Sequence, residues 1–383
     1  MAASYEALPH STLTDNFSRL AESGKARFTP ISPERYIKPP EVTYNINDLE
    51  RLTTEELEKI GISVDEVLEK LVLEETTLSK PEKNSGYETA MEWVNGYWDA
   101  MNKSLEKRLV GSNSKSEVYY ADVRLRALGV KRFLSVMQEF TDEGTFNQVN
   151  DILVTACDIC VLAEANAGKL NMDNIIKSGA IGRAVNLGLS DPKALDMAMK
   201  LVSAAHTERL GLFDHVESLV DGIKAEIVAG RIVSGYDFPD VGYDMVFQKP
   251  PAFRDVNEGA DFVLTIHDGK FSKELALFDV KKAEISNGQG SCRVVTEGNL
   301  PKIYEGDYER PSNLDLYDIE ANFLYAVAKN NEMGIVIRLP RDLVTNYSVE
   351  QLSEMDNKDN PDYNEAKSHI YRELGYILER VGK

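Results

Sequence analysis

The hydrophobic pattern of the chain changes from helical to strand-like near residue 240, and this change constrains the fold more than any other feature. Apolar residues recur at spacings of three and four almost throughout residues 87–208, whereas alternation with a period of two begins at Tyr243. The expected helices, in chain order, are 87–110, 116–140, 145–167, 172–187, 192–208 and 213–229. The sequence therefore predicts an α+β or α/β fold, in which a helical N-terminal domain precedes a domain that contains a sheet.

The strand-like part centres on residues 258–284, which predict a hairpin. The alternating apolar residues are Phe262, Leu264 and Ile266 on the first strand and Ala276, Phe278 and Val280 on the second. Asp268-Gly269, a typical turn pair, lies between them. A strand is expected before the hairpin at 243–247, and a helix over 314–329 and a strand over 334–340 are expected after it.

Each strand of the hairpin carries a carboxylate where a buried strand usually keeps an apolar side chain. Asp261 begins the first strand and Asp279 lies late in the second. Lys281 follows two residues after Asp279, so the side-chain period of two places this pair on the same face. Two acids and a lysine on one face suit a divalent cation beside a phosphodiester.

The hairpin register decides whether the two acids meet. A two-residue turn at Asp268-Gly269 would set Asp261 opposite Ala276, whereas a longer loop, or a bulge, would set Asp261 opposite Asp279. Two carboxylates so close repel each other unless a cation or a proton lies between them. The metal hypothesis therefore requires the longer loop or the bulge. The alternative is a solvent-facing hairpin with scattered charges.

Asp261 followed by Asp279-Val280-Lys281 resembles the D…(D/E)xK signature of the restriction-endonuclease-like nuclease superfamily. Ala260 stands where that family often has a proline. The expected order over residues 213–340, which is helix, three-strand meander, helix and strand, is similar to the common core of this superfamily. The resemblance implies a restriction-endonuclease-like core following the helical domain.

The resemblance also implies the chemistry of the site. Asp261 and Asp279 would hold Mg²⁺, with Mn²⁺ as a substitute, and the Val280 carbonyl would add a ligand. Lys281 would position or deprotonate the attacking water and offset charge on the phosphorus. The helix over 213–229 offers Glu226, or else Glu217, as a further metal ligand, although both are more typical of solvated surface acids.

The expected activity is that of a restriction-type DNA endonuclease of a cytoplasmic restriction system. Exonucleases of the superfamily often carry Q-x-x-x-Y on the helix after the lysine strand, and residues 319–325 contain no glutamine. The expected partner is duplex DNA, bound by a homodimer or a higher homo-oligomer. The candidate nucleic-acid-binding residues are Lys249, Arg254, Lys282, Arg293 and Arg338.

The net charge of −20 argues against nucleic-acid binding by the surface as a whole, since phosphate binding draws on Lys and Arg. A local basic cleft within an acidic protein remains compatible with it. The second hypothesis is a non-enzymatic structural or assembly protein, such as a viral or phage component. Its helices would form subunit contacts, and its acidic hairpin would be incidental.

The expected organisation is an extended N-terminal arm or tail (1–45), a helical domain (46–208), a nuclease-like core (209–345) and C-terminal helices (346–383). No run of 18 apolar residues predicts a membrane span, and no N-terminal pattern predicts a signal peptide. The three cysteines predict no disulfide framework. Cys157 and Cys160 are spaced as core residues of a buried helix, with a metal or redox role as the alternative.

Overall fold

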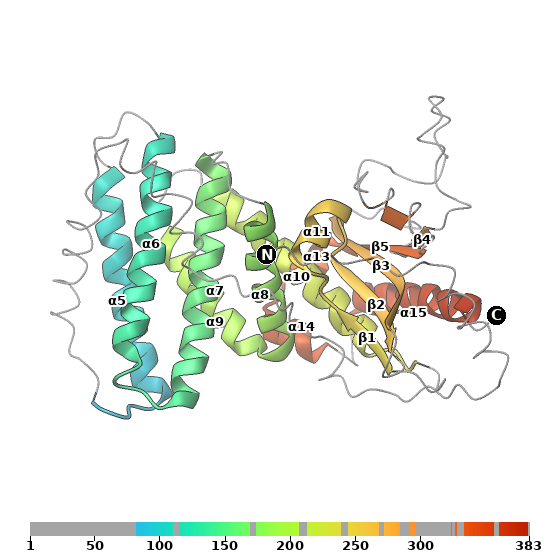
Figure 1. Cartoon of the computed structure of the whole chain (residues 1–383), viewed down its shortest axis with the longest axis horizontal. Coiled ribbons are helices and arrows are strands. Elements are labelled where there is room, and N and C mark those ends of the chain that lie inside the picture. The colour runs from blue at the N-terminus through green and yellow to red at the C-terminus, as the bar shows by residue number, and fades with distance from the viewer. Residues whose placement is uncertain are drawn as a thin grey trace, which may run out of the picture. The chain divides into compact units, whose positions relative to one another are not determined.

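The computed structural model divides the chain into two compact units, and each is described by itself. It describes residues 82–109, 115–168, 174–206, 213–238, 244–267, 272–283, 292–295, 323, 326–327, 333–355 and 360–381. The described part of the helical unit lies within 82–227 and 344–355, and that of the sheet unit lies within 228–343 and 360–381. The fold is of the α+β class (Figure 1).

The helical unit is built around one long apolar helix. Its helices are α5 (Tyr87–Leu109), α6 (Lys115–Met137), α7 (Glu143–Gly168), α8 (Asn174–Ser190), α9 (Pro192–His206), the first part of α10 (Phe213–Ser234) and α14 (Val349–Glu354). Helix α7 contacts α5, α6, α8 and α9 (Figure 1). Cys157 and Cys160 of α7 are fully buried and form no disulfide, which confirms that they are core residues.

Helix α7 is long and apolar enough, by length and composition alone, to cross a membrane. In the structure 67% of its most apolar window is buried inside the protein, as in the core helix of a soluble bundle. Among the residues that the structure describes, α7 is the one helix that meets this test.

Side-chain caps fix where several of these helices begin. The Asp142 carboxylate accepts the Thr145 N–H at 2.9 Å ahead of α7, and the Asp191 carboxylate accepts the Ala194 N–H at 3.0 Å ahead of α9. Ser348 and Gln351 form a reciprocal capping box on α14. These caps satisfy N–H groups that have no partner within the helix, so the sequence marks the helix starts locally.

A buried ion pair lies inside the helical unit. Arg126 of α6 donates to Glu164 of α7 at 2.7 Å, and both side chains are 0% exposed. Arg126 also donates to the Asn102 side chain and lies over the Trp98 ring, 5.5 Å from its centroid. The pair joins α5, α6 and α7 through polar contacts in an otherwise apolar core.

The sheet unit contains one five-stranded mixed sheet among its described residues. The strands are β1 (Asp244–Gln248), β2 (Phe262–His267), β3 (Ser272–Ala283), β4 (Cys292–Val295) and β5 (Met333–Pro340). They are arranged in the order β1-β2-β3-β5-β4. Only β3 and β5 pair in parallel, while the other neighbours are antiparallel.

Apolar side chains cover both faces of the central strands. On one face Phe262 stacks on Phe247 at 4.7 Å between ring centroids. Val263, Leu277 and Val336 belong to a cluster with the helical residues Phe323, Ala326 and Val327. Gly334 of β5 lies directly beneath that helix, since a Cβ there would meet Val327 at 2.8 Å and Phe323 at 2.9 Å.

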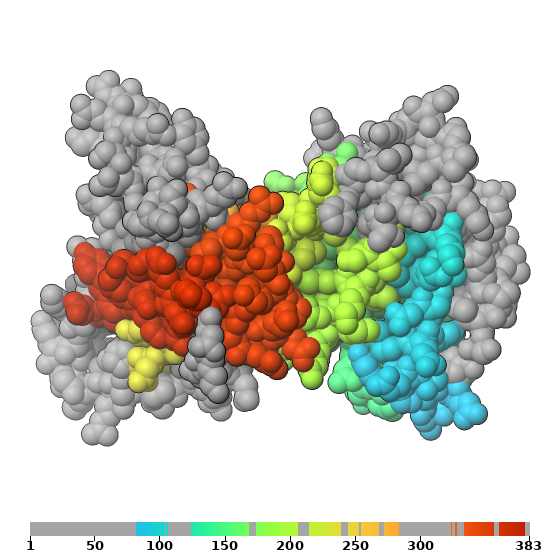
Figure 2. Space-filling view, turned by 180° about the vertical axis from the view of Figure 1, so that it is seen from behind, coloured from blue at the N-terminus to red at the C-terminus, as the bar shows by residue number. Residues whose placement is uncertain are grey.

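Helix α15 (Pro361–Val381) packs against β3, β4 and β5. Its buried stripe has helical spacing and consists of Tyr363, Ala366, Ile370, Leu374 and Ile377. The opposite side of the helix is open to solvent, and Figure 2 shows α15 in red along the surface of the sheet unit. Burial of one stripe explains why this mostly polar sequence forms a stable helix.

Several details differ from the sequence-based expectation. Helix α11 (Ala252–Glu258), strand β4 and helix α13 (Arg341–Thr345) are short elements that the pattern did not predict. The unit boundary falls between Ile227 and Val228, inside α10, whereas the expected boundary was at 208/209. An uninterrupted helix carries no composition signal for such a boundary. The expected arm (1–45) lies outside the described residues, as does most of the expected helix over 314–329.

Candidate functional site

Asp261 is held at the start of β2 by bonds to the neighbouring strand. Gly259 ends α11 with φ 63°, a left-handed conformation that favours glycine and turns the chain toward β2. The Asp261 N–H donates to the Phe278 carbonyl at 2.7 Å. One oxygen of its carboxylate, Oδ2, accepts the Val280 N–H at 2.6 Å. Both partners flank Asp279, so Asp261 is fixed beside the second acid of the motif.

A β-bulge produces this register. Phe262 pairs with Phe278 and Leu264 with Ala276, but the pairing shifts between Leu264 and Thr265. From Thr265 to His267, each residue therefore pairs with a partner one position nearer the turn than the pairing beside Asp261 would give. The bulge confirms that the hairpin departs from the simple two-residue turn, which would have set Asp261 opposite Ala276. Bulges often redirect side chains beside functional sites.

Asp279 lies at the centre of the sheet and is 0% exposed. Lys281, whose side chain is 28% exposed, forms an ion pair with it, with 2.8 Å between Nζ and Oδ1. The contact confirms that the two side chains lie on the same face of β3. A fully buried carboxylate needs such charge compensation, because desolvation of an isolated charge is costly.

Lys249 is a buried basic residue whose position the sequence does not reveal. It follows β1, its residue is only 3% exposed, and its Nζ lies 5.0 Å from the centroid of the Phe262 ring. Burial raises the pKa of the Asp261 carboxyl. The charges of Lys249 and Lys281 oppose that rise, the charge of Asp255 adds to it, and the Val280 hydrogen bond lowers the pKa. The positive charge of Lys249 thus lowers the pKa of Asp261, while Lys281 forms the ion pair with Asp279.

The other predicted basic residues occupy different environments. Arg338 is the register partner of Lys281 on β5, whereas Lys282 is the partner of Leu339. Paired positions share a face, so Arg338 lies on the face of Lys281 and Lys282 lies on the opposite face. Arg254 forms ion pairs with Glu258 and Glu274. Arg293 is in β4, and its side chain lies outside the described residues.

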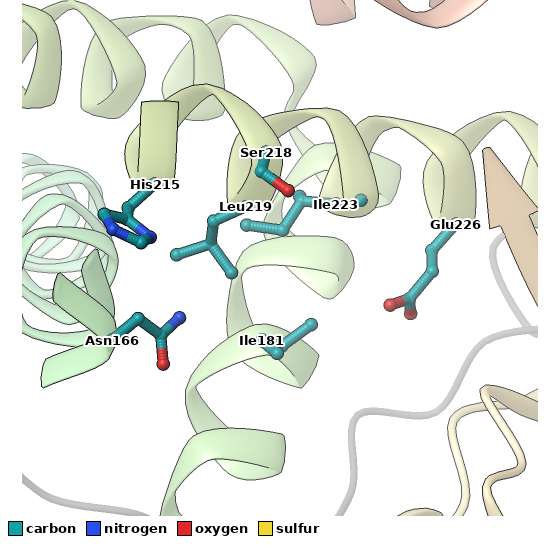
Figure 3. A pocket seen from close by; sticks show the side chains of 8 residues that line it. Asn166, Ile181, His215, Ser218, Leu219, Ile223 and Glu226 are labelled. Atoms are coloured by element: carbon teal, nitrogen blue, oxygen red, sulfur yellow. The ribbon is translucent and has the colours of Figure 1, made fainter. Parts of the chain in front are cut away.

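Glu226 belongs to the helical unit, whereas the two aspartates belong to the sheet unit. Its residue is 8% exposed and lines a pocket together with other residues of α10 (Figure 3). Glu217, on the same helix, is exposed. The expectation that Glu217 is a solvated acid is confirmed, and Glu226 is buried instead.

The donor set of the sheet unit fits a hard divalent cation that keeps much of its water. Among the described residues, no group of three or more His, Cys, Asp or Glu side chains is arranged to hold a metal ion. Mg²⁺ does not require one, since it is usually bound through one or two carboxylates and substrate phosphates. Asp261, Asp279 and the backbone at Val280 provide oxygen donors of that type.

Comparison of the chain with protein-family models, with curated proteins and with solved structures finds no match.

Proposed function

We propose that the protein is a metal-dependent phosphodiesterase, and specifically an endonuclease that acts on DNA. The observation that carries the proposal is the anchoring of Asp261 to the backbone on both sides of Asp279, which is itself paired with Lys281. This arrangement gathers two carboxylates and a lysine at one point of a buried sheet. Buried charges of this kind are costly and cluster at functional sites.

The order of elements supports the same proposal. Helix α10 precedes β1, β2 and β3. The helical residues Phe323, Ala326 and Val327 precede β5, which pairs in parallel with β3. This order is similar to the core of the restriction-endonuclease-like superfamily, with α11 and β4 added. The lysine strand β3 lies between β2 and β5, so both neighbours can contribute side chains to the site.

In the proposed reaction Asp261 and Asp279 would hold a divalent ion through their carboxylate oxygen atoms. The Val280 N–H points to Asp261, and the C=O of a strand residue points to the same side as its N–H, which directs the Val280 carbonyl toward the same place. A divalent ion held there would supply Lewis-acid stabilisation of the phosphate and would lower the pKa of a water molecule bound to it. Lys281 orients the attacking water and offsets developing negative charge.

The basic side chains of the sheet unit can supply the phosphate contacts that the average charge of −20 does not. Arg338 lies beside Lys281 on the same face of the sheet. Lys249 is almost fully buried, so it stabilises Asp261 and does not take part in general DNA attraction. Arg254 is engaged by two glutamates and would contribute less.

The test is cleavage of supercoiled and linear duplex DNA and of RNA by the full chain with Mg²⁺ or Mn²⁺. Nicking or cutting with metal, none in EDTA, and none in an identically purified Asp279→Asn protein are expected. The matched variant excludes a contaminating nuclease. No cleavage on a varied substrate panel with either metal, combined with sedimentation as large particles independent of metal, would instead support the assembly-protein hypothesis.

A further inference from the structure

The ion pair between Asp279 and Lys281 joins a fully buried carboxylate to a side chain that solvent partly reaches. Asp279 is 0% exposed, whereas the Lys281 side chain is 28% exposed, and 2.8 Å separates Oδ1 from Nζ. The stem of a lysine is flexible, so its ammonium group can leave the carboxylate and reach water while the backbone stays in place. Asp279 has no such freedom, because its short side chain lies on the central strand of the sheet.

Lys281 supplies positive charge to both acids of the motif. It contacts Asp279 directly. Burial raises the pKa of the Asp261 carboxyl, and the charges of Lys249 and Lys281 oppose that rise. Buried carboxylates need compensation of this kind, because desolvation of an isolated charge is costly. With the ion pair formed, which we call the resting state, Lys281 therefore provides charge that a cation bound to the two aspartates would also provide.

The ammonium group of Lys281 and a divalent cation would compete for the Asp279 carboxylate. Mg²⁺ binds carboxylate oxygens at about 2.0–2.1 Å. Because Nζ is already 2.8 Å from Oδ1, the two positive centres would lie within roughly 5–6 Å of each other. Like charges at that distance repel strongly inside a protein, where the effective dielectric constant is well below that of water. Binding of the cation therefore favours departure of the lysine.

Arg338 is the basic neighbour that a released Lys281 would meet. The two residues are register partners on β3 and β5, so their side chains lie on the same face of the sheet. Neighbouring strands are about 4.8 Å apart, and like charges directly opposite each other are destabilising. The ion pair with Asp279 draws the lysine charge back along β3 and reduces this repulsion. After release, the two cations lie side by side and favour an anion, such as a phosphodiester, between them.

We propose that Lys281 opposes the binding of a divalent cation to Asp279 in the resting state, and that cation binding releases its ammonium group toward the substrate phosphate, beside Arg338. The inference rests on the proposed function and adds a form of regulation to it, because the lysine becomes available to the phosphate only when the metal is bound. Lys281 thus has two positions, one on Asp279 and one beside Arg338.

The first test measures Mn²⁺ binding to the full chain by calorimetry, at fixed ionic strength and without nucleic acid. Lys281→Met keeps the length of the side chain and removes its charge. This variant should bind Mn²⁺ about tenfold more tightly than the wild-type protein, because the cation no longer displaces an ammonium group. Lys282→Met is the matched control, since it removes the same charge from the opposite face and should leave the affinity unchanged. Equal affinities of the wild-type and Lys281→Met proteins would overturn the inference.

The second test follows the lysine itself in the wild-type protein, so it does not depend on the folding of a variant. Limited acetylation is followed by cleavage after Glu274 and Glu284, and the resulting peptide contains both Lys281 and Lys282. Tandem mass spectrometry gives the extent of acetylation at each lysine. Saturating Mn²⁺ should raise the reactivity of Lys281 several-fold over that in EDTA and leave Lys282 unchanged. An unchanged or lower reactivity of Lys281 would contradict its release.

Asp279→Asn separates failure of this inference from failure of the proposed function. The variant should lose Mn²⁺ binding at the site, and its Lys281 should react to the same extent with Mn²⁺ and with EDTA. Circular dichroism establishes that the variant is folded. Equal Mn²⁺ binding by the wild-type and Asp279→Asn proteins, or none by either, would overturn the proposed function together with this inference. Binding that requires Asp279, with no change in the reactivity of Lys281, would overturn this inference alone.

Discussion

Asp279 and Lys281 lie two residues apart on one face of β3 and form an ion pair, with 2.8 Å between Oδ1 and Nζ. The carboxylate is fully buried, while the lysine reaches partly into solvent. A lysine in this position can neutralise Asp279 in the absence of a ligand and can still turn toward a phosphate.

The two adjacent lysines of β3 should have unequal effects on cleavage. Lys281→Ala should lower the rate about 10²–10³-fold, as removal of a preorganised charge-stabilising group typically does. Lys282→Ala should change the rate little, because Lys282 pairs with Leu339 on the opposite face. Single-turnover cleavage rates of both variants measure this difference. Equal losses would show that the face assignment is wrong.

Asp279→Asn should separate catalysis from folding. The variant should lose cleavage activity and keep its fold, because asparagine preserves the shape of the side chain while removing a buried charge beside Asp261. Thermal denaturation in EDTA measures stability, and the cleavage assay measures activity. An unfolded Asp279→Asn protein would instead identify Asp279 as a structural residue.

Breaking the buried ion pair between Arg126 and Glu164 should strongly lower the stability of the helical unit. Glu164→Gln should lower the free energy of unfolding by about 3–5 kcal/mol, because it leaves a buried guanidinium without its counter-charge. Replacement of both residues by leucine should cost less than the single change, since neither charge remains. Urea denaturation measures both variants. A double variant that is less stable than Glu164→Gln would contradict this explanation.

Two helix glycines should respond oppositely to alanine. Gly222→Ala should raise the free energy of unfolding by about 0.5–1 kcal/mol, because the new methyl group enters open space. Gly188→Ala should lower it by about 1–3 kcal/mol, because the methyl group would overlap Ile227 and Leu195. Urea denaturation measures the free energy of unfolding of both variants. A change of the same sign in both would contradict the packing described for the two glycines.

Lys224 should make stability rise at alkaline pH. Burial lowers its pKa below the ordinary 10.5, although the charges of Asp221 and Asp196 oppose this shift. The folded protein therefore loses this proton first as pH rises. The unfolded chain then binds more protons, so the free energy of unfolding increases between the folded pKa and 10.5.

Lys224→Met should remove that increase. Its side chain also loses the hydrogen bond that Lys224 donates to the Tyr347 carbonyl at 2.8 Å, so the variant should be less stable overall. Urea denaturation from pH 7 to pH 10 compares the two pH slopes. Parallel slopes for the wild-type and variant proteins would exclude Lys224 as the source.

The helices and the long strands were predictable because their signals are local. The stripe Val216, Leu219, Ile223 and Ile227 predicts α10, and the cap at Asp191 marks the start of α9. Short elements such as α11 and β4 were not predictable, since four to seven residues hold too little periodicity. Asp261, Asp279 and Lys281 were recognisable from their spacing, whereas nothing in the sequence predicts that Lys249 is buried over the Phe262 ring.

By itself the sequence determined the order and type of the main elements and the shared face of Asp279 and Lys281, because both follow from periods of 3.6 and 2 along a single segment. The tertiary structure decided the shift between Leu264 and Thr265, the burial of Lys249 against the Phe262 ring, and the burial of Glu226. Each of these three features depends on contacts between segments that are distant in the chain. The local sequence allows several strand registers and side-chain positions, and the packing between segments selects one of them.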